Sequence, residues 1–245
     1  MWSLLILVSL LGGVYFIIKP KKKVSGFSVP KEFPIKWRTF LSATVQFYKN
    51  LTPKEKFLFE EDVLEFLTRI RITGIKTNVT DEDRLLVASS GVIPVFAFPD
   101  WKYHHLSEVL LYPNSFDENY SIGTENARIT GMVGDGAMDN IVIFSKPALH
   151  LGFKNSQDKK NVGIHEFVHL FDKEDGTIDG VPEIMMDHQY SLPWLNLIHK
   201  KTVDILDGKT DINPYSTTNA QEFLAVTSEY FFERPRLLKQ KHPEL

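Results

Sequence analysis

The sequence predicts an α+β fold, in which a mostly helical domain contains a small mixed sheet and is preceded by one N-terminal transmembrane helix. Three observations support this prediction. Helical patterns occupy both ends of residues 35–245, short β-branched runs cluster between them, and residues 2–18 are apolar without a charge. The chain has 245 residues, of which 43% are apolar and 24% charged, so it is long enough for one sizeable globular core.

The N-terminal segment, residues 2–18, reads WSLLILVSLLGGVYFII and would form a helix about 25 Å long, near the lower limit for crossing a bilayer. Four lysines follow within residues 19–23. A secretory signal carries its positive charge before the apolar run, so residues 1–18 are better interpreted as an uncleaved single-pass anchor with the rest of the chain in the cytoplasm. A buried core helix is the alternative, but such helices rarely lack a polar face.

Residues 19–34, KPKKKVSGFSVPKEFP, combine basic residues with three prolines and are predicted to be a linker. Residues 35–245 then form a single predicted domain. Because residues 1–30 contain four lysines and no acidic residue, this domain is more acidic than the net charge of −3 indicates. The charge argues against nucleic-acid binding, which requires a basic face.

The first part of the domain, residues 35–72, has a helical pattern. Within it, Thr52, Pro53 and Glu55 match the N-cap, N1 and N3 positions of a helix start. A further helix is predicted over residues 80–90, where Thr80 is the N-cap and acidic residues fill the first turn.

The middle of the domain is predicted to form strands, and the last part to form helices. The expected strands are residues 92–98, 106–112, 127–133 and 140–145. Gly134-Asp135-Gly136 predicts a hairpin between the last two strands. Residues 140–145 could pair with an extended substrate, although an ordinary central strand is the simpler interpretation. The expected C-terminal helices are residues 159–172, 192–206 and 220–232.

The pattern HExxH occurs at His165, Glu166 and His169. Residues four apart share one face of a helix, so both imidazoles can reach one ion and Glu166 can reach a water held there. The surrounding helix is apolar nearly all round, which predicts burial, and burying these groups is costly unless a metal satisfies them. Ordinary surface His and Glu residues are the alternative. Since the chain has no cysteine, a metal must be held by His, Asp or Glu.

A third ligand is not determined by spacing. Glu222 and Glu229 lie seven residues apart and share a face of one predicted helix. Glu222 could instead form a capping box with Asn219, and Glu229 could be solvated. Asp172, seven residues after His165, could either orient a ligand imidazole or simply end the helix.

Three segments, HEFVHLFDKEDG, NPYSTTNAQEFLAVTSEYFFERP and RLLVASSGVIPVFAFPDW, together resemble the Mlc titration factor A family of zinc metallopeptidases over roughly residues 35–240. The resemblance implies a fold similar to the catalytic domain of anthrax lethal factor. It also implies peptidase activity, described in the family as aminopeptidase activity on small substrates. Two departures are an apolar N-terminus, absent from the soluble enterobacterial members, and Ala220-Gln221-Glu222 where the family usually has Pro-Ala-Glu.

Carried over residue by residue, the resemblance assigns Zn²⁺ to His165, His169 and Glu222. Glu166 becomes the general base, and Tyr215, seven residues before Glu222, lies near the metal. The resemblance, rather than the spacing, therefore favours Glu222 over Glu229.

The sequence thus predicts a membrane-anchored zinc peptidase that acts on peptides or proteins from the cytoplasmic side. Glu166 would activate the water, and Tyr215 would donate a hydrogen bond to the oxyanion. The main alternative is a zinc-stabilised binding protein that sequesters a transcriptional regulator with little or no hydrolysis. Glu166 argues against that alternative, because a purely structural zinc site closes with four protein ligands and needs no base.

Overall fold

The computed structural model describes residues 27–182 and 188–245. The predicted anchor, residues 1–18, and the first part of the predicted linker lie outside these ranges. Within them, no helix is long and apolar enough to cross a membrane. In the part of the linker that is described, Phe27 and Phe33 pack their rings against Trp37, with centroids 6.3 and 5.4 Å apart.

The first helical region is divided into three helices: α2 (Ile35–Thr44), α3 (Gln46–Asn50) and α4 (Pro53–Arg69). The predicted capping box begins α4, because Thr52 and Glu55 each bond the other's backbone N–H. The expectation that the helical region extends to residue 72 is wrong, since the chain becomes extended after α4 and forms β1 (Arg71–Gly74).

The sheet has four strands in the order β1-β2-β4-β3, with β2 (Glu108–Tyr112), β3 (Gly131–Val133) and β4 (Ile141–Ser145). The first three in this order are parallel, whereas β3 runs antiparallel to β4. The predicted hairpin joins β3 and β4 through the short 3₁₀ turn η1 (Gly136–Met138). The mostly helical domain with a small mixed sheet is therefore confirmed. Because β4 is paired on both sides, it has no free edge for an extended substrate.

A strand over residues 92–98 is not formed, because α5 (Asp81–Val95) continues through most of that run. This helix begins with the predicted cap, where the Thr80 side chain accepts the N–H of Asp83. Its second half is buried all round, so an apolar β-branched run does not distinguish a buried helix from a strand here. Gly91 is required at the contact with α4, since a Cβ there would lie 2.6 Å from the Phe66 ring.

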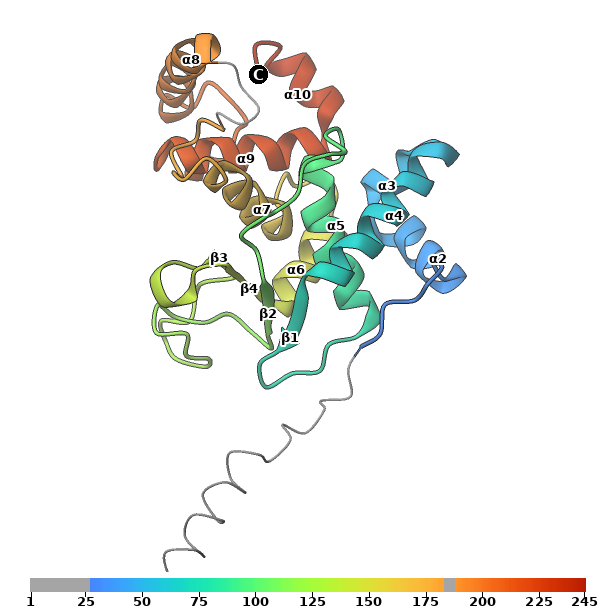
Figure 1. Ribbon diagram of the computed structural model, residues 1–245. Coiled ribbons are helices and arrows are strands. Elements are labelled where there is room, and N and C mark those ends of the chain that lie inside the picture. The colour runs from blue at the N-terminus through green and yellow to red at the C-terminus, as the bar shows by residue number, and fades with distance from the viewer. Residues whose placement is uncertain (1–26, 183–187) are drawn as a thin grey trace, which may run out of the picture.

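The remaining helices are α6 (Lys146–Lys154), α7 (Val162–Lys173), α8 (His188–Leu206), α9 (Ala220–Glu233) and α10 (Pro235–Lys241). The sequence predicted α7, α8 and α9 and missed α6 and α10. Figure 1 shows α7 lying between α9 and the sheet, and α7 contacts α5, α9 and β3. This central position places the HExxH helix where several elements can shape its surroundings.

Two apolar clusters flank the position of the motif. The larger one surrounds Phe167 on α7, whose ring packs against those of Phe66, Tyr103 and Phe144. The smaller one joins α8, α9 and α10 through side chains such as Ile198 and Phe223. Burial of these apolar faces fixes α7 against α9 and leaves the polar residues of both helices facing each other.

Candidate metal centre

The two histidines are presented by α7, which begins at Asn161. The Asn161 side chain caps this helix by accepting the N–H of Ile164 at 3.1 Å. One turn of helix separates His165 from His169, and their imidazole rings meet edge to face with centroids 4.7 Å apart. The two Nε2 atoms lie 3.1 Å from each other, so both rings present the same nitrogen to one point.

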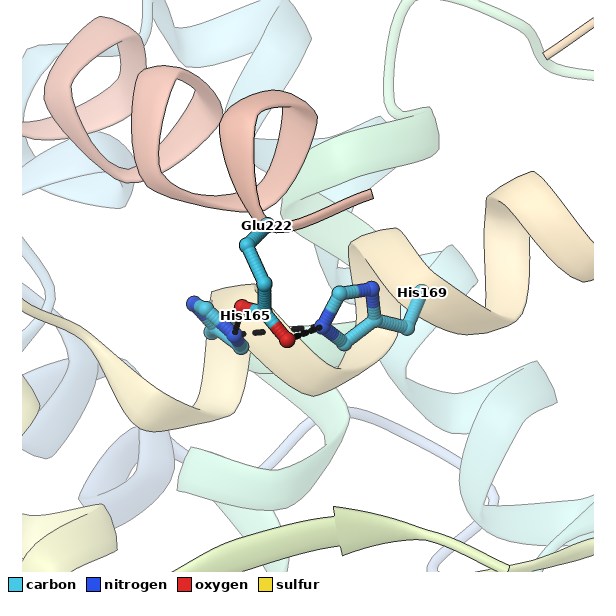
Figure 2. A group of neighbouring side chains, drawn as sticks. All are labelled: His165, His169 and Glu222. Atoms are coloured by element: carbon cyan, nitrogen blue, oxygen red, sulfur yellow. Dashed lines mark hydrogen bonds and ion pairs between the residues drawn. The ribbon is translucent and has the colours of Figure 1, made fainter. Parts of the chain in front are cut away.

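The third group is Glu222, in the first turn of α9, as Figure 2 shows. The Asn219 side chain caps α9 by accepting the backbone N–H of Glu222 at 2.8 Å. The carboxylate is directed to the histidines, with Oε2 3.0 Å from Nε2 of His165 and Oε1 3.6 Å from Nε2 of His169. Among the described residues Oε2 has no hydrogen-bond partner, because its approach to His165 lacks hydrogen-bond geometry.

These donor atoms fit a divalent metal. One atom from each of His165, His169 and Glu222 lies within 4.8 Å of the others. In a tetrahedral zinc site with bonds of about 2.0–2.1 Å, donor atoms are about 3.3 Å apart. The separations of 3.0, 3.1 and 3.6 Å agree with that spacing. Two imidazole nitrogens and a carboxylate that face each other in a largely buried site are suited to holding a cation between them.

The electrostatics of the site also favour a cation. Burial by itself lowers the pKa of His165, but the carboxylates of Glu222 and Glu229 outweigh it and raise the pKa to about 10. Burial raises the pKa of Glu222, yet the two histidines outweigh it and lower the pKa to about 2. The protein therefore holds a proton on His165 when no metal is bound, and a metal would have to replace that proton.

Glu166 lies beside the edge strand β3. Its side chain is buried, with 7% of the residue exposed, and burial raises its pKa, an effect that the neighbouring histidines oppose. The backbone of Gly131 in β3 approaches it closely, because a Cβ at that position would lie 2.7 Å from Oε1 of Glu166. Glycine therefore allows the strand to pass directly over this carboxylate.

Tyr215 is held near the histidines by the 3₁₀ turn η2 (Pro214–Thr217), whose cap, Asn213, accepts the N–H of Tyr215 at 3.1 Å. Its ring centroid is 6.1 Å from that of His165, and 53% of the residue is exposed. Burial, together with the nearby carboxylates of Glu222 and Glu166, raises the pKa of the phenol. The hydroxyl therefore keeps its proton at neutral pH and can donate it.

Comparison with known proteins identifies the family. The sequence model of the family of glucose-regulated metallopeptidases M90 matches residues 21–245 of the chain. The chain belongs to this M90 family. It is 25% identical over 194 residues to Mlc titration factor A of Pectobacterium atrosepticum, covering 74% of this chain and 72% of the relative. It is 29% identical over 228 residues to the uncharacterized protein slr2042 of Synechocystis sp., covering 88% of this chain and 82% of that protein. The resemblance seen in the sequence is confirmed.

Glu229 has a position in this M90 protein that the sequence did not predict. It is neither solvated nor directed at the face of the histidines where Glu222 lies, and only 6% of it is exposed. Its Oε1 lies 2.8 Å from Nδ1 of His165, and its other oxygen accepts the N–H of Asn161. The spacing of seven residues between Glu222 and Glu229 correctly places both on one side of α9. It could not show that they reach opposite edges of the same imidazole.

Of the two alternatives for Asp172, a hydrogen bond to a ligand imidazole is not formed. Its Oδ2 accepts the N–H of Gly180 at 2.8 Å, which ties the loop after α7 back to the helix. Among the described residues, neither its Oδ1 nor Nδ1 of His169 has a hydrogen-bond partner. Burial raises the pKa of Asp172 to about 6. Asp172 therefore lies in the last turn of α7, as the second alternative has it, but its side chain is buried and holds the following loop.

Proposed function

We propose that this M90 protein is a zinc-dependent peptidase whose zinc is held by His165, His169 and Glu222. The observation that carries the proposal is the convergence of two Nε2 atoms and one carboxylate at separations of 3.0–3.6 Å between α7 and α9. Three protein ligands leave a position open for water and substrate, as in catalytic zinc sites.

The residues around this centre supply the groups that peptide hydrolysis requires. A zinc ion bound there would acidify a water and polarise the scissile carbonyl. Glu166 removes the proton from the water as it attacks and then delivers that proton to the departing amine. Tyr215 donates its phenolic proton in a hydrogen bond to the carbonyl oxygen as negative charge develops on it.

The substrate is a peptide or protein that pairs with β3, the strand at the edge of the sheet next to the centre. An extended backbone added to β3 would pass Glu166, because Gly131 brings that strand against the Glu166 side chain. The extended substrate therefore pairs with β3, at the free edge of the sheet, and not with residues 140–145 of β4.

A peptide assay tests this function. The parent protein should cleave peptides, lose activity in a chelator and recover it with zinc. Glu166→Gln should retain zinc and lose about 10²–10⁴-fold in turnover, because the base is not a ligand. Amino-acid amides and internally quenched peptides, assayed side by side, separate aminopeptidase from endopeptidase cleavage. Chelator-resistant cleavage, or full activity of Glu166→Gln, would contradict the mechanism.

The second candidate is a zinc-stabilised binding protein that sequesters a transcriptional regulator. It is favoured by the name of the relatives, Mlc titration factor A, which points to an interaction with a regulator. A pull-down with Glu166→Gln discriminates the two. Peptidase activity predicts proteins that are trapped by the variant and cleaved by the parent. Sequestration predicts that parent and variant retain the same uncleaved regulator equally.

The protein is further proposed to be a single-pass membrane protein with residues 1–18 as anchor, residues 19–34 as linker and the peptidase domain, residues 35–245, in the cytoplasm. Support comes from the charge-free run at residues 2–18 and the lysines that follow it. The full chain should sediment with membranes and resist a carbonate wash, whereas a chain beginning at Ser25 should be soluble. Release of the intact chain by carbonate, or cleavage near residue 20, would exclude the anchor.

A further inference from the structure

Glu229 uses both of its carboxylate oxygens on α7. One oxygen accepts a hydrogen bond from Nδ1 of His165 at 2.8 Å, and the other accepts the backbone N–H of Asn161. Glu229 lies on the same face of α9 as Glu222 and is almost completely buried. Burying a carboxylate is costly, so a group kept there with both oxygens occupied has a specific task.

The contact with Nδ1 determines what the other nitrogen of His165 can do. A carboxylate can only accept, so Nδ1 of His165 must carry the proton that is shared with Glu229. In the neutral imidazole the lone pair is then on Nε2, the atom that lies 3.1 Å from Nε2 of His169. The hydrogen bond therefore selects the tautomer and fixes the plane of the ring.

The contact with Asn161 extends this control to the helix. Asn161 caps α7 through its side-chain oxygen, and its amide nitrogen donates to the carbonyl of Gly152 in α6 at 3.2 Å. One carboxylate thus holds both the start of α7 and the first histidine on it. A negative group is also favourable at the N-terminus of a helix, where the N–H dipoles point.

His169 provides an internal comparison. Among the described residues its Nδ1 is buried without a hydrogen-bond partner. Only His165, of the two, is oriented by a carboxylate behind it. The protein should therefore fix the ring orientation of His165 more strongly than that of His169.

We propose that Glu229 is the positioning residue of the metal centre: it holds His165 as the Nδ1–H tautomer with Nε2 directed at the metal. The inference rests on the proposed zinc function, because positioning is useful only if Nε2 is a ligand. Loss of such an outer carboxylate typically weakens metal binding by about 10–100-fold and leaves the ligands themselves in place.

The test compares three variants by competition with a chromogenic zinc chelator. Glu229→Gln keeps one acceptor oxygen, but its NH₂ group cannot accept the second N–H, so zinc should bind about 10-fold more weakly than in the parent. Glu229→Ala removes both acceptors and should weaken binding by about 100-fold. Glu233→Gln is the matched control: it removes a carboxyl whose oxygens are buried, one turn further along α9, with no hydrogen bond to His165, and should bind zinc within about twofold of the parent.

A second readout needs neither zinc nor activity. In the metal-free parent, Nδ1–H of His165 should give a slowly exchanging, downfield proton resonance in nuclear magnetic resonance spectra, because it is buried and hydrogen-bonded to a carboxylate. Glu229→Ala should lose that resonance, and Glu233→Gln should keep it. Circular dichroism of each metal-free variant identifies any that does not fold, and Glu229→Gln, being isosteric, then carries the comparison.

The outcomes separate the two proposals. A parent chain that binds no zinc would overturn the proposed function, and the Nδ1–H resonance alone would then decide whether Glu229 orients His165. Zinc affinity of Glu229→Ala within twofold of the parent, or an unchanged resonance, would overturn the positioning role. If Glu229→Gln lost zinc as completely as Glu222→Gln, Glu229 would be a ligand rather than a positioning residue.

Discussion

His165 lies between two glutamates of the same helix, with Nε2 3.0 Å from Glu222 and Nδ1 2.8 Å from Glu229. The two contacts use opposite edges of the imidazole, so the two carboxylates have different tasks. Glu222 shares the open side with His169, whereas Glu229 lies behind the ring. This arrangement gives each carboxylate a distinct expected phenotype.

Substitution of the glutamates should separate zinc binding from turnover. Glu222→Gln removes a charged donor from the converging set, so we expect purified protein with little zinc and little activity. Glu166→Gln should contain as much zinc as the parent and have little activity, because the role proposed for its side chain is to take a proton and not to bind the metal.

Metal analysis of proteins purified without added zinc, together with peptide turnover, checks both expectations. Glu229→Gln is the comparison, since it should largely retain zinc. If instead Glu222→Gln bound zinc normally and Glu229→Gln did not, the assignment would be reversed. Glu222 would then have only its place in the first turn of α9, beside the cap Asn219.

Between elements, Asp83 joins α5 to α6. Its carboxylate is fully buried, accepts the N–H of Thr80 at the start of α5, and contacts Lys146 at 2.8 Å and His150 at 2.7 Å on α6. Burial raises the pKa of Asp83, but the hydrogen bonds from His150 and Lys146 outweigh it and hold the pKa well below its usual value of 3.8. The ionised form is therefore part of the folded structure.

This clamp predicts a specific acid sensitivity. Because the pKa of Asp83 is lower in the folded than in the unfolded chain, its contribution to the free energy of unfolding is complete above about pH 4 and is lost as the pH falls further. Asp83→Asn should lower the free energy of unfolding by roughly 3 kcal/mol at pH 7. It should also flatten the dependence on pH between about 4 and 2.

Urea unfolding at a series of pH values measures this contribution. Asp81→Asn is a suitable control, since Asp81 is more exposed and pairs with Lys36 at the surface. If the free energy of unfolding of Asp83→Asn fell with decreasing pH as steeply as that of the parent, other carboxylates would account for the acid sensitivity.

In the whole molecule, the candidate centre is where the two apolar clusters meet. The larger cluster includes α7 and Ala225 of α9, the smaller one includes other side chains of α9, and the donor atoms come from both helices. A bound metal would therefore crosslink α7 and α9. Ligand binding to the native state alone stabilises a protein by about 2.7 kcal/mol at 100 times Kd.

Removal of the metal should accordingly lower the Tm, and zinc should restore it. Binding should weaken as the pH falls from 8 toward 5, because the pKa of His165 is raised to about 10 in the metal-free protein and each ion must displace a proton. Scanning calorimetry with and without a chelator, and zinc titrations across this range, measure both effects. A Tm unaffected by chelation, or affinity independent of pH, would contradict them.

Much of the local structure could be predicted from the sequence alone. The caps at Thr52 and Thr80 begin helices as predicted, because a cap depends on residues within one turn. The strand predicted over residues 92–98 is wrong, because α5 continues to Val95 and packs against α4 and α7, which lie elsewhere in the sequence. The position of β4 inside the sheet likewise depends on β2 and β3, and not on its own residues.

The sequence by itself determined that His165 and His169 share a face, that Glu166 adjoins them and that Glu222 and Glu229 point the same way. These relations follow from helical periodicity, which acts over a few residues. Only the tertiary structure decided that Glu222 reaches the Nε2 side and Glu229 the Nδ1 side of His165. That choice depends on how α9 lies across α7, which is fixed by apolar packing between segments that are distant in the chain.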